Sequence, residues 1–91
     1  MAEPEADRYR YTARDLERVA PREVRVGDLI AHAGRPGSGL FSVDRVIAVG
    51  WAGTDPALKV DTWRIEYRSP WGDLYFVNPD TFPVYRLKAA T

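Results

Sequence analysis

The sequence contains no cysteine and only one histidine, His32, among its 91 residues. The lack of cysteine excludes disulfides, thiolate catalysis and zinc sites that use cysteine ligands. A catalytic or metal-binding histidine needs partner side chains within reach, and there is no second histidine to supply one. We therefore expect His32 to be an ordinary strand residue, and we predict no metal site and no cofactor.

No apolar run approaches the roughly 20 residues that a membrane-spanning helix needs. The first seven residues, MAEPEAD, are acidic and polar, which is the wrong chemistry for a secretory signal. We expect a cytoplasmic protein without a membrane partner. Residues 1–7 are predicted to be a disordered lead-in, and residues 8–91 a single small domain.

Motifs that mark enzymes are also missing. Ser38 and Ser42 could act as nucleophiles only with His32 as the base, and neither lies in a G-x-S-x-G elbow. The loop Gly34–Gly39 lacks the Lys-Ser/Thr ending of a phosphate-binding loop. Acidic residues are scattered, mostly at turns or alternating with arginine. The sequence therefore predicts a protein without catalytic activity.

The charges cancel, with 13 basic and 13 acidic residues. A neutral chain has no overall positive field to attract nucleic acid, so any such binding must come from a local patch. Only Lys59 and Lys88 are lysine, and the other basic residues are arginine. This bias is typical of proteins from genomes of high GC content.

Alternating hydrophobicity is the strongest structural signal in the chain. Within Lys59–Arg68, the side chains of Trp63, Ile65 and Tyr67 should point to one face, and those of Arg64, Glu66 and Arg68 to the other. Upstream, Thr12 and Asp15 form the pattern of a capping box, which predicts a helix of about two turns that ends before Pro21. Residues 50–58 are predicted to be a loop because of their glycines and proline.

The whole pattern predicts a mainly β fold. We expect a small SH3-like barrel of five to six antiparallel strands with one short N-terminal helix, because closure removes exposed sheet edges. The predicted strands are Val24–Val26, Leu29–Ala33, Leu40–Val49, Lys59–Arg68, Leu74–Val77 and Phe82–Leu87.

Three stretches, YTARDLERVAPREVRVGDLI, FSVDRVIAVG and NPDTFPVYRL, together resemble a pattern found in small SH3-like barrel proteins of actinobacteria and their phages. The resemblance covers most of Tyr11 to Leu87. It implies the barrel fold and an actinobacterial or phage origin, with the cytoplasm of the bacterial host as the location. It brings no site residues with it.

Two surfaces are candidates for binding a partner. Aromatic side chains beside arginine dominate the hot spots of protein interfaces, which makes a protein the favoured partner, from the phage or from its host. The predicted partner-binding residues are Trp51, Arg64, Arg68, Trp71 and Tyr75.

The alternative partner is nucleic acid. Arginines spaced by four would form one basic stripe along an N-terminal helix, which suits phosphate contacts. The stripe would consist of Arg10, Arg14, Arg18 and Arg22. The outer face of Arg64 and Arg68 could serve the same purpose, with bases stacked on neighbouring aromatic side chains. The sequence leaves the oligomeric state open.

Overall fold

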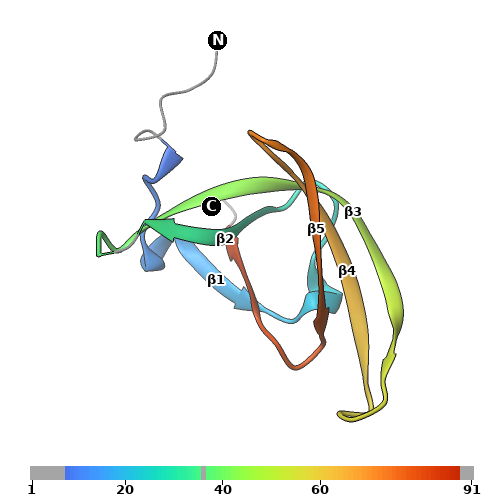
Figure 1. Ribbon diagram of the computed structural model, residues 1–91. Coiled ribbons are helices and arrows are strands. Elements are labelled where there is room, and N and C mark those ends of the chain that lie inside the picture. Colours follow the sequence, from blue (N-terminus) through green and yellow to red (C-terminus); the bar gives the residue numbers. More distant parts are fainter. Residues whose placement is uncertain (1–7, 36, 89–91) are drawn as a thin grey trace.

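The computed structural model describes residues 8–35 and 37–88. Six strands dominate it (Figure 1). Their bounds are Leu16–Val19 (β1), Leu29–Arg35 (β2), Leu40–Asp55 (β3), Val60–Ser69 (β4), Gly72–Pro79 (β5) and Val84–Leu87 (β6). Two short 3-10 helices flank β1, namely Ala13–Asp15 (η1) and Pro21–Glu23 (η2).

All six strands belong to one antiparallel sheet in the order β1-β6-β2-β3-β4-β5. The sheet curves around a common centre, so that β5, at one end of the strand order, comes back toward β6, which lies next to the other end (Figure 1). Among the described residues, β1 pairs only with β6 and β5 pairs only with β4, so these two strands are the sheet edges. The predicted fold class is confirmed as a mainly β architecture of six antiparallel strands.

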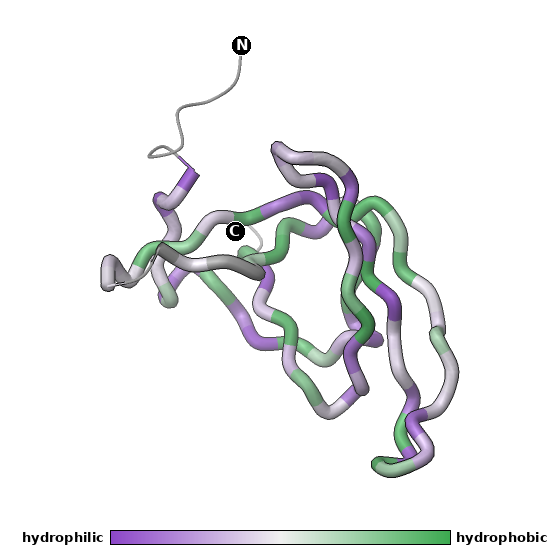
Figure 2. The backbone as a smooth tube through the Cα atoms, in the orientation of Figure 1, coloured by the Kyte–Doolittle hydropathy of each residue, from purple (hydrophilic) through white to green (hydrophobic). Residues whose placement is uncertain are grey.

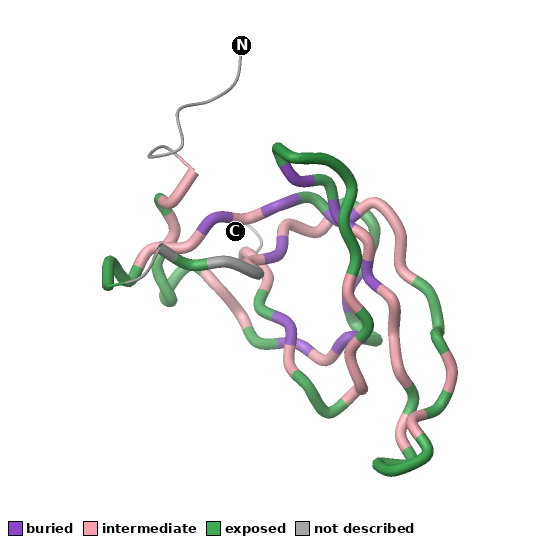
Figure 3. Tube along the Cα trace, in the orientation of Figure 1, coloured by how far each residue is buried: buried purple, intermediate pink, exposed green. Residues whose placement is uncertain are grey.

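One core lies on the concave side of the sheet. The alternation predicted for β4 is confirmed, because Ile65 and Tyr67 are buried and Arg68 is exposed. Apolar and polar stretches alternate along the strands, and the buried stretches lie on strand segments around the centre (Figures 2 and 3). The buried apolar residues are Val19, Val24, Ile30, Val46, Ile65, Tyr67 and Val84, with Val49 and Phe76 packed against them.

The predicted two-turn N-terminal helix is wrong. The capping box does form, with the Thr12 amide donating to the Asp15 carboxylate at 2.8 Å, but it starts only the three-residue η1. From Leu16 the chain is the strand β1, in which Val19 lies opposite Val84 of β6. Pairing with β6 and burial of Val19 outweigh the weak helical preference of so short a segment.

Further boundaries differ from the prediction. β6 begins at Val84 instead of Phe82, and β5 begins at Gly72 instead of Leu74. The expected strand Val24–Val26 is instead a turn region, because η2 begins at Pro21 and Gly27 takes a φ of 97°. The expected loop over residues 50–58 is mostly strand, because β3 continues to Asp55. The Asp55 side chain accepts the amide hydrogens of Ala57 and Leu58, both at 2.8 Å, and so closes a tight turn at the end of a long β3–β4 hairpin.

Candidate functional site

Exposed apolar side chains are concentrated on β5 and on the turn that precedes it. Trp71 is 71% exposed and Tyr75 is 60% exposed, and both are large aromatic side chains. Leu74 and Val77 of the same segment are also exposed. Exposed apolar side chains concentrated on one segment make it a candidate contact surface. We refer to Arg64, Arg68, Trp71, Tyr75 and Val77 as the β5 surface.

The outer face of β4 and β5 joins these aromatics to arginine. Arg64 lies opposite Val77 in the register of the two strands, and its guanidinium lies over the Tyr75 ring, 4.2 Å from the ring centroid. The same guanidinium donates to the Glu66 carboxylate at 2.9 Å. The structure therefore brings Arg64 and Tyr75 into direct contact, and Glu66 compensates the charge of Arg64.

Arg68 is compensated in the same way at the other end of β4. Its Nε donates to the Asp73 carboxylate at 3.1 Å, and this hydrogen bond raises the pKa of the Arg68 guanidinium above its usual value. With Glu66 and Asp73 beside Arg64 and Arg68, the outer face carries two charges of each sign. The charged side chains that β4 and β5 contribute to this face therefore cancel.

Trp71 lies in the turn between β4 and β5, and the chain preceding β1 reaches it. The Arg8 guanidinium lies 5.0 Å from the centroid of the Trp71 ring and donates to the buried carboxylate of Asp44 at 3.2 Å. The hydroxyl of Ser69 accepts the Trp71 amide hydrogen at 3.2 Å and holds the turn in shape. Trp71 is thus fixed at its base, while most of its ring surface faces solvent.

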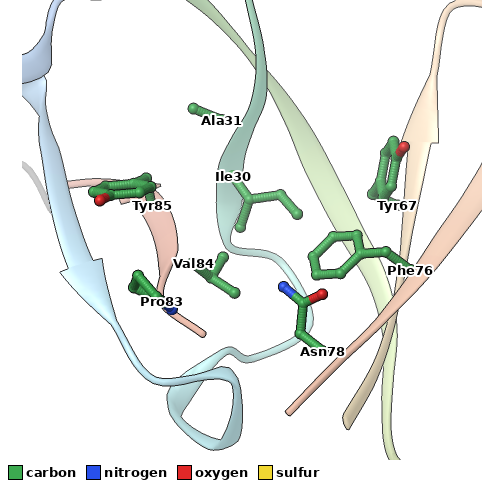
Figure 4. A pocket seen from close by; sticks show the side chains of 8 residues that line it. All are labelled: Ile30, Ala31, Tyr67, Phe76, Asn78, Pro83, Val84 and Tyr85. Carbon is green, nitrogen blue, oxygen red and sulfur yellow. The ribbon is translucent and has the colours of Figure 1, made fainter. Parts of the chain in front are cut away.

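A pocket opens between β5 and β6, where the curved sheet has no strand pairing (Figure 4). We call it the seam pocket, and its volume is about 360 Å³. Phe76 and Asn78 of β5 point into it from one side and Val84 of β6 from the other (Figure 4). The full lining is Ile30, Ala31, Tyr67, Phe76, Asn78, Pro83, Val84 and Tyr85, and none of these side chains is charged at neutral pH.

Tyr67 forms the inner wall of the seam pocket next to Phe76, with 6.0 Å between the ring centroids. Burial raises the pKa of the Tyr67 phenol above its usual value, and the nearby Asp44 carboxylate adds to the effect. Both causes disfavour the phenolate. At neutral pH the pocket therefore presents a neutral phenol and the Asn78 amide among apolar side chains.

Trp51 does not join the β5 surface. It lies opposite Trp63 across the β3–β4 hairpin, on the face of β4 that also carries Ile65, whereas Arg64 belongs to the other face. Its indole N–H donates to the Asp61 carboxylate at 3.1 Å, so this tryptophan supports the hairpin. Of the five predicted partner-binding residues, the structure brings Arg64 and Tyr75 into contact, places Arg68 and Trp71 toward the turn of the same β4–β5 hairpin, and separates Trp51.

The predicted arginine stripe does not exist as a helical face. Arg14 belongs to η1, and Arg18 lies in β1, opposite Tyr85 on the outer side of the sheet. The Arg10 guanidinium lies over the Tyr11 ring, and Arg22 forms an ion pair with Asp80. A helix is required to align residues spaced by four, and β1 replaces it.

The remaining sequence candidates are His32, Ser38 and Ser42. His32 belongs to β2, and its side chain lies outside the described part, as do residues 1–7, which were predicted to be disordered. Ser42 is buried, and the Ser38 hydroxyl accepts the Leu40 amide hydrogen at 3.1 Å. Within residues 8–35 and 37–88, no three metal-ligating side chains gather, and no helix is long and apolar enough to cross a membrane.

Sequence reasoning missed the seam pocket and the open edge of β5. The alternation of Leu74, Phe76 and Asn78 was a usable signal for the inner face of β5, but nothing local shows that β5 is an edge. No protein-family model, no curated protein and no solved structure matches this chain.

Proposed function

We propose that this chain is a non-catalytic accessory protein that binds another protein through the β5 surface. The observation that carries the proposal is the concentration of exposed apolar side chains on one edge strand and its turn. Trp71 and Tyr75 supply large, stiff contact areas, and Arg64 holds the Tyr75 ring in place. Interface hot spots are rich in tryptophan, tyrosine and arginine.

The charge arrangement favours a protein over nucleic acid as the partner. Proteins that track a phosphate backbone need cations whose counterions are released on binding. On the β5 surface, Arg64 already forms an ion pair with Glu66, and Arg68 forms one with Asp73. Phosphates would have to displace these carboxylates, whereas a protein partner can cover neutral ion pairs at the rim of an interface.

Photo-crosslinking in an extract of the source organism tests the proposal. Benzoylphenylalanine replaces Tyr75 in one variant, and Tyr85, a tyrosine on the outer face of β6 that is 45% exposed, in the matched control. We expect protein adducts from position 75 that persist after nuclease treatment, disappear in the Trp71→Ala background and are missing from position 85. Equal adducts from both positions would contradict the proposal.

Fluorescence anisotropy with labelled single-stranded and duplex DNA and RNA tests the alternative partner. We expect no saturable binding. Binding that weakens linearly with the logarithm of salt concentration, and that is lost in Arg64→Gln, would replace the protein partner with nucleic acid.

A further inference from the structure

The free edge of β5 has few of the features that normally protect a sheet edge. Edge strands are usually kept apart by lysines, prolines, bulges or short length. β5 is eight residues long, pairs with β4 in an unbroken register and contains no lysine or arginine, and its one proline, Pro79, is its last residue. Its only charged side chain, Asp73, lies near one end and is held by Arg68. Along its other side, no strand within residues 8–35 and 37–88 pairs with its backbone amides and carbonyls.

The seam pocket could accommodate side chains of a strand that pairs with the free edge of β5. A strand added to the free edge of β5 would continue the sheet, so every second side chain of that strand would point to the inner face. Phe76 and Asn78 point to this face and line the pocket there (Figure 4). Because no lining side chain is charged at neutral pH, the inward side chains of the added strand must be apolar or neutral.

The sequence of β5 itself meets these requirements. When two copies run antiparallel about a two-fold axis at Phe76, Leu74 lies opposite Asn78 of the other copy on the inner face. On the outer face, Tyr75 lies opposite Val77, and Asp73 lies opposite Pro79. No like charges face each other. Aromatic side chains opposite β-branched ones are favourable cross-strand pairs, and the zero net charge of the chain removes long-range repulsion between copies.

We propose that the occupant of the β5 edge is a second copy of this chain, paired β5 to β5 in antiparallel fashion. The two six-stranded sheets join into one, and Leu74 and Phe76 of each copy help to cover the seam. This inference goes beyond the proposed function, because it uses the backbone edge of β5, whereas the partner protein binds the outer face. Pairing places two copies of the outer face side by side, which provides a bivalent surface.

Sedimentation equilibrium of the purified protein tests the proposal without any partner. We expect a monomer–dimer equilibrium with a dissociation constant on the order of 10 µM, because two short edge strands bury less area than a standard interface. Val77→Lys should weaken the dimer at least about tenfold by placing a charge on the edge. Val26→Lys is the control, since Val26 is 65% exposed and lies outside the strands.

The register is tested with single cysteines, because the chain has none of its own. A mixture of the Tyr75→Cys and Val77→Cys variants should form a mixed disulfide under mild oxidation, much faster than a mixture of Val26→Cys and Tyr85→Cys. A protein that stays monomeric well above the expected dissociation constant, or a dimer that Val77→Lys leaves intact, overturns the proposal. In the cross-linking test, adducts of the chain with itself report on the dimer and adducts with a different protein report on the partner, so the two proposals can fail separately.

Discussion

The two edge strands of this sheet are built in opposite ways. β1 has four residues, buries Val19 in the core and lies between two 3-10 helices. On its inner side, Glu17 accepts a hydrogen bond of 2.6 Å from Arg86. β5 has eight residues, carries one charge and exposes most of its apolar side chains. One edge is short, charged and flanked, and the other is long, apolar and open.

The contrast shows that exposure of β5 is not a general property of this small protein. The same sheet protects β1 by means that natural proteins commonly use, namely short length, charge and flanking turns. Arg86 also donates to the Asp28 carboxylate at 3.2 Å, and its hydrogen bond to Glu17 is the main cause that raises its pKa above the usual value. The open edge at β5, in a sheet whose other edge strand β1 is protected, is therefore a feature to be explained by function.

The largest expected difference between the edges comes from deleting the same two methyl groups on each. Val19→Ala should lower the free energy of unfolding by about 2 kcal/mol, because Val19 is buried and its truncation leaves a cavity. Val77→Ala should change it by less than about 0.5 kcal/mol, because Val77 is 46% exposed. Urea denaturation of dilute protein measures both values. Equal losses would mean that β5 is packed as tightly as β1.

A second pair of variants compares the ion pairs of the two edges. Arg86→Met should lower the free energy of unfolding by about 1–2 kcal/mol, because it leaves the partly buried carboxylates of Glu17 and Asp28 without their cation. Arg68→Met removes an exposed ion pair with Asp73 and should leave stability unchanged. Thermal unfolding followed by circular dichroism gives the ranking, and the reverse order would contradict it.

Alkaline pH should lower the free energy of unfolding through Tyr67, the side chain on the inner wall of the seam pocket beside β5. The pKa of Tyr67 is raised above its usual 10.0, so the folded state favours the neutral phenol. This contribution to stability is fully present below pH 10 and is lost as the pH rises through the folded-state pKa. Denaturation at several alkaline pH values should show the loss, and Tyr67→Phe should lack it.

The titration of the Tyr67 phenol also tests whether a second copy covers the seam pocket beside the β5 edge. If a second copy covers the seam pocket, the absorbance titration of Tyr67 at about 295 nm should move to higher pH as protein concentration rises, since desolvation increases. A titration independent of concentration, at concentrations where the protein is dimeric, would mean that the dimer leaves the seam uncovered.

A small effect is expected at the turn before β1. Asp15→Ala removes the carboxylate that accepts the Thr12 amide hydrogen and should lower the free energy of unfolding by about 0.5 kcal/mol. The Asp15 carbonyl still accepts the Lys88 amide hydrogen at 2.9 Å, which ties η1 to the end of β6. Amide hydrogen exchange should speed up at Thr12 and not in β5. Faster exchange in β5 would mean that the stability of β5 depends on the turn before β1.

Much of the candidate site was predictable, because period-two alternation is a local property. It assigned Ile65 and Tyr67 to the core and Arg64 to the outer face without knowledge of the fold. Proximity to Arg64 along the hairpin likewise selected Tyr75. Trp51 was grouped with them only by residue type, and the extra length of β3 placed it on the other face.

The sequence by itself determined that the protein is mainly β, which residues of β4 face the core, and where the capping box of Thr12 and Asp15 begins. Each of these depends on residues a few positions apart. Only the tertiary structure decided that the chain after Asp15 becomes β1, because its pairing partner is β6, about 70 residues away. The same distant pairings decided that β5 keeps a free edge, since a strand is an edge only by virtue of what does not pair with it.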